Sequence, residues 1–136
     1  YSGEIDIMDT IGGSGQEAMV VNNMYWNNGG LTADYAPASY GYEHRIANTD
    51  DGETFSNTFH VFSFEWTEDR VTWYVDDVQT HSAPITTSNM SEAFRNEFFL
   101  IFNVAVGGTW PGAPNSTSNF PRGMLVDYVR VFQQTN

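Results

Sequence analysis

Acidic side chains gather near the start of the chain, where the sequence GEIDIMD begins at residue 3. The alternation of Glu4 and Asp6 with Ile5 and Ile7 predicts a strand that carries both acids on one face. On a regular strand Asp9 would point away from Glu4 and Asp6. The pattern therefore puts two carboxylates side by side and leaves a third just out of line.

A β-bulge at Ile7-Met8 would bring Asp9 back to the face of Glu4 and Asp6, because it adds one residue to the strand. Like charges repel, so packing alone does not explain such a row. A retaining glycosidase, however, needs two carboxyl groups roughly 5–5.5 Å apart, one as nucleophile and one as general acid/base. A third carboxylate between them would couple their titrations. The heptapeptide leaves open the alternative of an acidic strand edge or a cation site.

The composition narrows the class of protein. The chain has 136 residues, a usual length for one domain, and 40% of them are hydrophobic, which is enough for a core. A net charge of -12 disfavours nucleic acid and acidic polymers as partners and favours a neutral polymer. With no cysteine, a thiol nucleophile and disulfide bonds are excluded. No apolar run is long enough to span a membrane.

The elements that must position the acids are predominantly strands. Only Asn89–Asn96 suggests a short helix, and Thr67-Glu68-Asp69 predicts a hairpin turn. The predicted strands cover Gly3–Asp9, Thr58–Trp66, Arg70–Val78, Val78–Ser82, Glu97–Val106 and Met124–Phe132. This pattern predicts an all-β fold of two packed antiparallel sheets. Several strands are apolar on both faces, so we expect further strands from elsewhere to cover them.

The motif resembles the Glu-x-Asp-x-x-Glu signature of glycoside hydrolase family 16 in its bulged, laminarinase-like form. Three further blocks resemble family segments in the same order: FHVFSFEWTEDRVTWYVDD from Phe59, FFLIFNVAVGGTWPGAPN from Phe98 and FPRGMLVDYVRVFQ from Phe120. The family fold is a concanavalin-like β-jelly roll of roughly twice this length, with its catalytic strand near the middle. The resemblance therefore implies that residues 1–136 form the C-terminal, active-site half of one catalytic domain, incomplete in this chain.

The resemblance implies a role for each acid. Glu4 matches the nucleophile and Asp6 the assisting carboxylate, whereas Asp9 stands where the family has an acid/base Glu. Asp is one methylene shorter, so its oxygens retreat by roughly 1.5 Å. A displacement of about 1 Å at a reacting centre costs about a hundredfold in rate. We expect a weakened enzyme rather than an inactive one.

Aromatic residues are the candidates for binding sugar. Tyr25 stands where related sequences usually carry His, and its hydroxyl can still hydrogen-bond a sugar. Trp26 and Trp110 are candidates for stacking on the C–H faces of sugar rings; the alternative for each is a role in the core or in anchoring a loop. His60, inside an aromatic strand, is interpreted as a hydrogen-bonded core histidine.

Asp127 interrupts an otherwise apolar strand and therefore needs a partner. The resemblance implies a structural calcium ion there, with its other ligands in the N-terminal half; a salt bridge or backbone hydrogen bonds would serve equally well. No cofactor is expected for catalysis.

These observations predict a secreted endo-β-1,3-glucanase that acts by retention on a neutral, laminarin-type polysaccharide. Its partner would be the N-terminal half of the domain, whether in the same chain or in a separate one. Two alternatives remain: a weakened or inactive β-glucan-binding protein on the same fold, and a family member acting on mixed-linkage glucan or a galactan. The bulged motif disfavours the mixed-linkage type, and the charge disfavours sulfated galactans.

Overall fold

The computed structural model describes residues 3–12, 15–29, 37–45 and 54–135, and of residues 42–45 the backbone alone. The chain divides into two compact units, Tyr1–Phe99 and Leu100–Asn136. All regular secondary structure in the described part of the chain belongs to the first unit.

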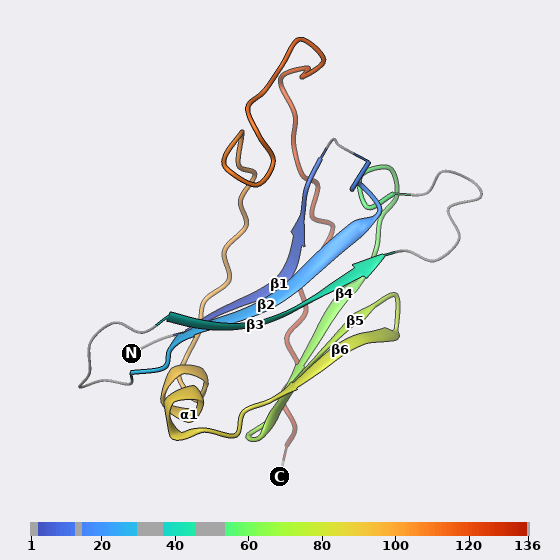
Figure 1. The fold of residues 1–136 in the computed structure, drawn as a ribbon. Coiled ribbons are helices and arrows are strands. Elements are labelled where there is room, and N and C mark those ends of the chain that lie inside the picture. Colours follow the sequence, from blue (N-terminus) through green and yellow to red (C-terminus); the bar gives the residue numbers. More distant parts are fainter. Residues whose placement is uncertain (1–2, 13–14, 30–36, 46–53, 136) are drawn as a thin grey trace. The chain divides into compact units, whose positions relative to one another are not determined.

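The first unit contains two three-stranded antiparallel sheets (Figure 1). One sheet has the order β1-β2-β3 and the other β4-β5-β6. The strands and the helix have these bounds: β1 Glu4–Thr10, β2 Met19–Asn27, β3 Pro37–Arg45, β4 Phe62–Trp66, β5 Arg70–Val75, β6 Val78–Pro84 and α1 Ser88–Phe94. In each sheet, strands that follow one another in the sequence are hydrogen-bonded neighbours.

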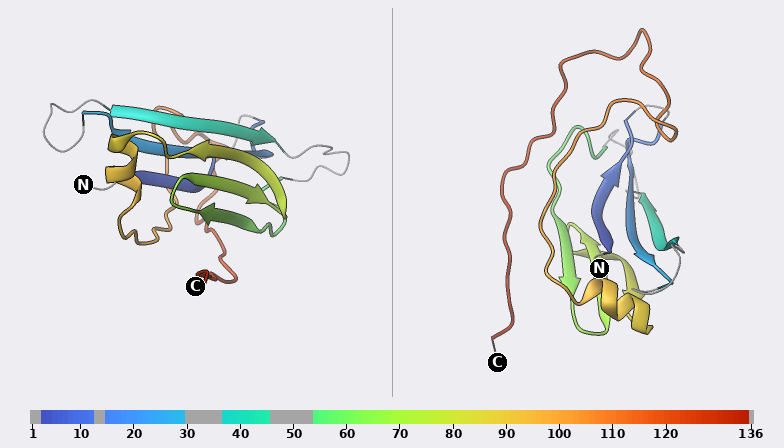
Figure 2. Two further views of the ribbon diagram at one scale, coloured as in Figure 1. Left: turned by 90° about the horizontal axis from the view of Figure 1, so that it is seen from below. Right: turned by 90° about the vertical axis from the view of Figure 1, so that its left-hand side faces the viewer.

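The two sheets lie face to face and share one hydrophobic core (Figure 2). The sheet of β1–β3 contributes Met24 to this core, and the sheet of β4–β6 contributes Val71, Trp73 and Ala83. Trp73 is the largest side chain that is fully buried. This arrangement confirms the prediction of an all-β antiparallel sandwich.

Helix α1 packs against one end of the sandwich, where Phe94 is fully buried and meets the edge of Trp26 with ring centroids 6.0 Å apart. The hydroxyl of Thr87 caps the helix by accepting a hydrogen bond from Met90 N at 3.2 Å. Gly3 N donates to Ala93 O at 3.2 Å, which ties the entry of β1 to the helix. A Cβ on Gly3 would lie 2.5 Å from the Phe94 ring, so only glycine fits this approach.

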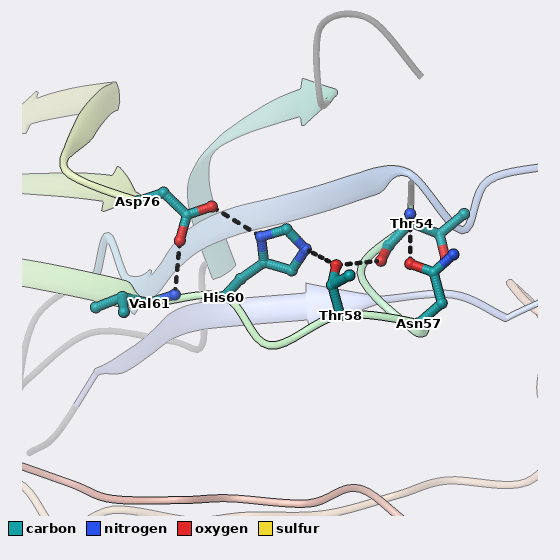
Figure 3. Close-up of polar contacts among 6 residues, drawn as sticks. All are labelled: Thr54, Asn57, Thr58, His60, Val61 and Asp76. Atoms are coloured by element: carbon teal, nitrogen blue, oxygen red, sulfur yellow. Dashed lines mark hydrogen bonds and ion pairs between the residues drawn. The ribbon is translucent and has the colours of Figure 1, made fainter. Parts of the chain in front are cut away.

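The hairpin of β5 and β6 turns at Asp76 and Asp77, which have φ angles of 49° and 64°. Two successive positive φ angles are those of a type I′ turn, whose twist matches that of the strands. The side chain of Asp76 also binds the segment before β4. Its Oδ1 accepts a hydrogen bond from Val61 N at 2.8 Å, and its Oδ2 lies 2.7 Å from His60 Nδ1 (Figure 3).

The hydrogen-bonded chain continues from His60 Nε2 to the Thr58 hydroxyl at 2.8 Å. Carboxylate, imidazole and hydroxyl thus follow the order of a nucleophilic triad. The imidazole, however, is only 5% exposed, and Phe55 and Phe62 pack beside it. We therefore assign a structural role to the hydrogen bonds that join Asp76, His60 and Thr58. We call this set of bonds the latch, because it holds residues 58–61 to the turn. The prediction that His60 is a hydrogen-bonded core histidine is confirmed.

Strand prediction was correct where contacts are local. The first strand, the two strands of the β4–β5 hairpin and the short helix are confirmed, although β4 begins at Phe62 because the latch occupies the residues before it. Sequence analysis missed two strands, β2 and β3.

The prediction of strands at Glu97–Val106 and Met124–Phe132 is wrong for this structure. Both segments lack regular secondary structure, and their apolar side chains are mostly exposed. Ile101 is 70% exposed and Val131 84%. A strand exists only through hydrogen bonds to a neighbouring strand, and no segment among the described residues pairs with either one.

The second unit, residues 100–136, contains turns instead of strands. Gly107, Gly108 and Gly112 have positive φ angles, and Gly112 N donates to Gly108 O at 3.0 Å. Asn115 closes a further turn, because its side-chain oxygen accepts a hydrogen bond from Thr117 N at 2.9 Å.

No helix in the described part of the chain is long and apolar enough to cross a membrane.

We predict that the latch stabilises the fold at neutral pH and not in acid. Partial burial by itself raises the pKa of Asp76, but the hydrogen bonds from His60 and Val61 N outweigh it and hold the pKa below its usual value. A lowered carboxyl pKa adds stability that is present above the unfolded pKa of about 3.9 and is lost as the pH falls through the folded value. Asp76→Asn should therefore lower the free energy of unfolding at pH 7 by up to about 1 kcal/mol.

Thermal melting between pH 2 and pH 8 measures this effect; the difference from wild type should begin to shrink near the unfolded pKa of about 3.9 and should vanish only below the lower, folded pKa of Asp76. Asp77→Asn, at the next position of the same turn, is the control. An equal loss at every pH would show that the charge of Asp76 contributes nothing.

Candidate active site

Strand β1 presents Glu4 and Asp6 on the face of its sheet that points away from the core. In the register with β2, Glu4 is opposite Tyr25 and Asp6 is opposite Asn23. Directly opposed residues on antiparallel strands have their side chains on the same face. The two acids, the phenol and the carboxamide therefore form one polar surface, while the neighbouring pair Ile5 and Met24 packs inward.

The register between β1 and β2 shifts between Asp6 and Asp9. Asp6 is paired with Asn23 and Asp9 with Val21, so Ile7 and Met8 together oppose the single residue Asn22. This is the β-bulge that the sequence predicted. One extra residue reverses the alternation of side chains, which returns Asp9 to the face of Glu4 and Asp6.

Proximity and burial change the acidity of Asp6. Its pKa is raised to about 7, first by burial, then by the charges of Glu4 and Asp9, and by a hydrogen bond with the Glu4 side chain. Asp6 is therefore about half protonated near neutral pH. Its protonated form adds no second negative charge beside Glu4, which reduces the repulsion within the row of acids.

Burial also raises the pKa of Asp9, with a further contribution from the charge of Glu4, against a smaller lowering by the hydrogen bond from the Thr10 backbone. A raised pKa keeps a carboxylic acid protonated at a higher pH, which is the property of a proton donor. The row thus contains one acid suited to hold a proton beside Glu4 and one suited to donate a proton.

Tyr25 faces the same three carboxylates. Burial and then the charges of Asp6, Glu4 and Asp9 raise the pKa of its phenol, which keeps the hydroxyl protonated. The side chain is still 42% exposed. Its hydroxyl is therefore able to donate a hydrogen bond to a ligand that lies over the acids.

Sequence analysis missed Asn23 and Gly41, which complete this surface. Gly41 of β3 is opposite Asn23 in the register, and a Cβ on Gly41 would lie 1.8 Å from Asn23 Oδ1. The carboxamide therefore occupies the space that a side chain at residue 41 would fill. The only signal in the sequence was a glycine within a polar-aromatic stretch, and it was hidden because β3 itself was not predicted.

The two tryptophans proposed for sugar binding belong to different units of the chain. Trp26 lies on the opposite face of β2 from Tyr25 and packs against Phe94 and the core. This placement supports the alternative in which Trp26 is a core residue. Trp110 is 48% exposed and lies in a turn of the second unit.

Asp127 belongs to the second unit and is exposed. Among the residues that the structure describes, no three His, Cys, Asp or Glu side chains gather as a metal site.

Comparison with known proteins places this surface in a family. The sequence profile described as "Glycosyl hydrolases family 16" matches residues 1–130. The Clotting factor G alpha subunit of Tachypleus tridentatus is 33% identical over 99% of this chain and 18% of its own length. Glucan endo-1,3-beta-glucosidase A1 of Niallia circulans is 34% identical over 98% of this chain and 19% of its own length.

Comparison of the fold with solved structures points to the same family. The structure of the laminarinase catalytic domain from Thermotoga maritima MSB8 matches with a TM-score of 0.67 and 35% identity, over 87% of this chain and 45% of that one. The chain spans about a fifth of each of these curated relatives and less than half of the solved domain. With its profile match over residues 1–130 and its bulged row of acids, the chain belongs to glycoside hydrolase family 16.

Proposed function

We propose that this chain carries the catalytic acids of an endo-acting hydrolase that cleaves β-1,3-glucan with retention at the anomeric carbon. The observation that carries the proposal is the shifted register of β1 on β2, which sets Asp9 on the same face as Glu4 and Asp6. Retaining hydrolysis needs a nucleophile and a proton donor on the same substrate bond. No packing requirement of the fold accounts for three acids on this face.

In the first step a carboxylate oxygen of Glu4 attacks the anomeric carbon. The bond to the leaving sugar breaks, and Asp9 gives its proton to the leaving oxygen. In the second step Asp9 takes a proton from water, whose oxygen attacks the same carbon and releases Glu4. The raised pKa of Asp9 supports its role as donor in the first step.

Asp6 assists by holding a proton toward Glu4. Its pKa of about 7 means that it is largely protonated below neutral pH. A neutral Asp6 donates a hydrogen bond to Glu4 without adding a second negative charge beside it. This hydrogen bond orients Glu4 for attack. A neutral Asp6 also does not repel the electron-rich oxygens of the sugar.

The substrate class follows from charge and surface chemistry. A chain with a net charge of -12 repels anionic polymers, which favours a neutral glucan. Tyr25 and Asn23 offer hydroxyl and carboxamide groups beside the acids, and these suit sugar hydroxyls. Trp110 remains a proposed stacking residue for a sugar ring.

A binding protein is the second candidate, and Asp9 is the observation that favours it. The shorter side chain at the acid/base position weakens catalysis in any geometry that keeps the backbone fixed. One of the two curated relatives above is named as a glucosidase and the other as a clotting-factor subunit. Family membership therefore leaves catalysis to be tested.

We further propose that an N-terminal half of the domain, in this chain or another, supplies strands to pair with Glu97–Val106 and Met124–Phe132. Their exposed apolar side chains support this, since such segments are stable once covered on both faces. A structural calcium ion at Asp127 would take its other ligands from the same source. Secretion is part of the proposal, because the polymer lies outside the cell.

The first prediction tests the acid/base residue by reducing-end release from laminarin, with the protein in the assembly in which the chain occurs. Asp9→Glu restores about 1.5 Å of reach, so kcat should rise, by up to about a hundredfold. Asp9→Asn should lower kcat by about 10²–10⁴-fold, since it removes the proton donor. If neither wild type nor Asp9→Glu releases sugar while laminarin still binds, the protein is a glucan-binding protein.

The second prediction concerns the pH profile of kcat/KM on laminarin. Asp6 loses its proton near pH 7; it then no longer donates a hydrogen bond to Glu4 and adds a negative charge beside the nucleophile. Activity should fall above about pH 7 with an apparent pKa that belongs to the coupled acids. Asp6→Asn removes this titration and should shift the alkaline limb; an identical limb in that variant would exclude Asp6 as its origin.

A further inference from the structure

The bulge in β1 interrupts its pairing with β2 just before Asp9. Ile7 and Met8 have no partner of their own in the register and together face Asn22. A bulge of this kind leaves backbone groups outside the regular ladder, and it persists only if other groups bind them. The groups that bind them therefore decide where Asp9 points.

Asn22 supplies such a group from within the core. Its side chain is directed between the sheets, where the residue is 1% exposed, and Nδ2 donates a hydrogen bond to Ile7 O at 2.7 Å. Because a carbonyl oxygen can only accept, this bond fixes which end of the carboxamide is the nitrogen. Asn22 thus bridges from β2 to the first residue of the bulge.

A second bond orients the carboxamide. Asn22 Oδ1 lies 3.2 Å from the Thr80 hydroxyl on β6 of the opposite sheet. The oxygen of a carboxamide only accepts, so Thr80 must be the donor. The second sheet therefore holds Asn22 in the position from which it reaches Ile7.

Trp73 acts on the residue before the bulge. Its indole Nε1 donates to Asp6 O at 3.1 Å, and its ring is 1% exposed. Two successive carbonyl groups of β1, those of Asp6 and Ile7, are thus bound by side chains that approach from the core. These contacts lie on the face of β1 opposite to the acids.

We propose that Asn22 is a positioning residue for the acid/base Asp9. Its bond to Ile7 holds the extra residue in β1, and without that residue the alternation of the strand would turn Asp9 away from Glu4. Asn22 faces the core, so it cannot contact a substrate that lies over the acids. The inference rests on the proposed function, in which Asp9 is the proton donor.

The effect should fall on Asp9 more than on Glu4. Glu4 precedes the bulge and keeps its own register partner, Tyr25, whereas Asp9 follows the bulge and depends on its geometry. Loss of Asn22 should therefore impair proton donation and leave nucleophilic attack nearly intact. Two substrates with different leaving groups separate these steps.

The experiment compares laminarin with a 2,4-dinitrophenyl β-laminarioligosaccharide, using the protein in its natural assembly. Dinitrophenolate is a stable anion and leaves without a proton, so its initial burst reports attack by Glu4 alone. Asn22→Ala should lower kcat on laminarin about 10- to 100-fold with little change in KM. The rate of the dinitrophenolate burst should change less than about threefold, because a misplaced Asp9 is not used.

Asn27→Ala is the matched control. Asn27 is a buried asparagine on the same strand, 5% exposed, and it accepts a hydrogen bond from Gly29 N at 3.1 Å. Its loss should lower the melting temperature without separating the two substrates. Thr80→Val keeps the side-chain shape and removes the hydroxyl that bonds Asn22 Oδ1 and Trp73 O, each at 3.2 Å. If Asn22→Ala fails to fold, Thr80→Val should give the same separation of the two substrates, with a smaller difference.

Equal losses of rate on both substrates in Asn22→Ala, or no loss on laminarin, would overturn the positioning role of Asn22. Hydrolysis of laminarin by the wild type would still support the proposed function. A wild type that releases neither sugar nor dinitrophenolate would overturn the proposed function and, with it, this inference. A normal burst with slow laminarin cleavage in Asn22→Ala and Thr80→Val, absent in Asn27→Ala, is the result expected.

Discussion

One extra residue in β1 governs the chemistry of this chain. Because Ile7 and Met8 share a single partner on β2, the strand brings a third carboxylate to a face that already carries two. Burial, together with the charges of Glu4 and Asp9, raises the pKa of Asp6 to about 7, and a proton on Asp6 relieves part of the repulsion among these acids. The sandwich, the helix that holds Gly3 and the ladder to β2 all serve to keep this short strand in one register.

The parts of the fold that were predictable are those set by neighbours in sequence. The alternation around Glu4, the β4–β5 hairpin and the short helix each follow from local pattern, whereas the bulge was one of two interpretations of the acid spacing and was favoured by the family resemblance. Strand β2 was missed because Asn22 puts a polar group at a core position, which breaks the alternation that marks a strand. The residue that hides the strand from sequence analysis is the one that binds the bulge.

Sequence analysis named the acids of the candidate site and Tyr25, but not the pairing that brings them together, nor Asn23 and Gly41. Tyr25 and Asn23 reach the acids only through the pairing of β2 with β1, a contact between distant segments that no local pattern encodes. Trp26 illustrates the same limit, since one step along the strand places it in the core instead of on the polar face. The apolar segments after residue 96 have the composition of buried strands, yet they are mostly exposed, and the described chain holds no strand paired with them.

The division of β2 into two faces has a consequence for how such a protein could diversify. Asn22 and Met24 point into the core, while Asn23 and Tyr25 point toward solvent beside the acids. Substitutions at Asn23 and Tyr25 should change the polar surface beside the acids and leave the core packing intact. Substitutions at Asn22 should instead change the direction in which the Asp9 side chain points. Laboratory libraries confined to Asn23 and Tyr25 would vary this polar surface at small risk to folding, provided that Gly41 is kept, because a Cβ there would lie 1.8 Å from Asn23 Oδ1.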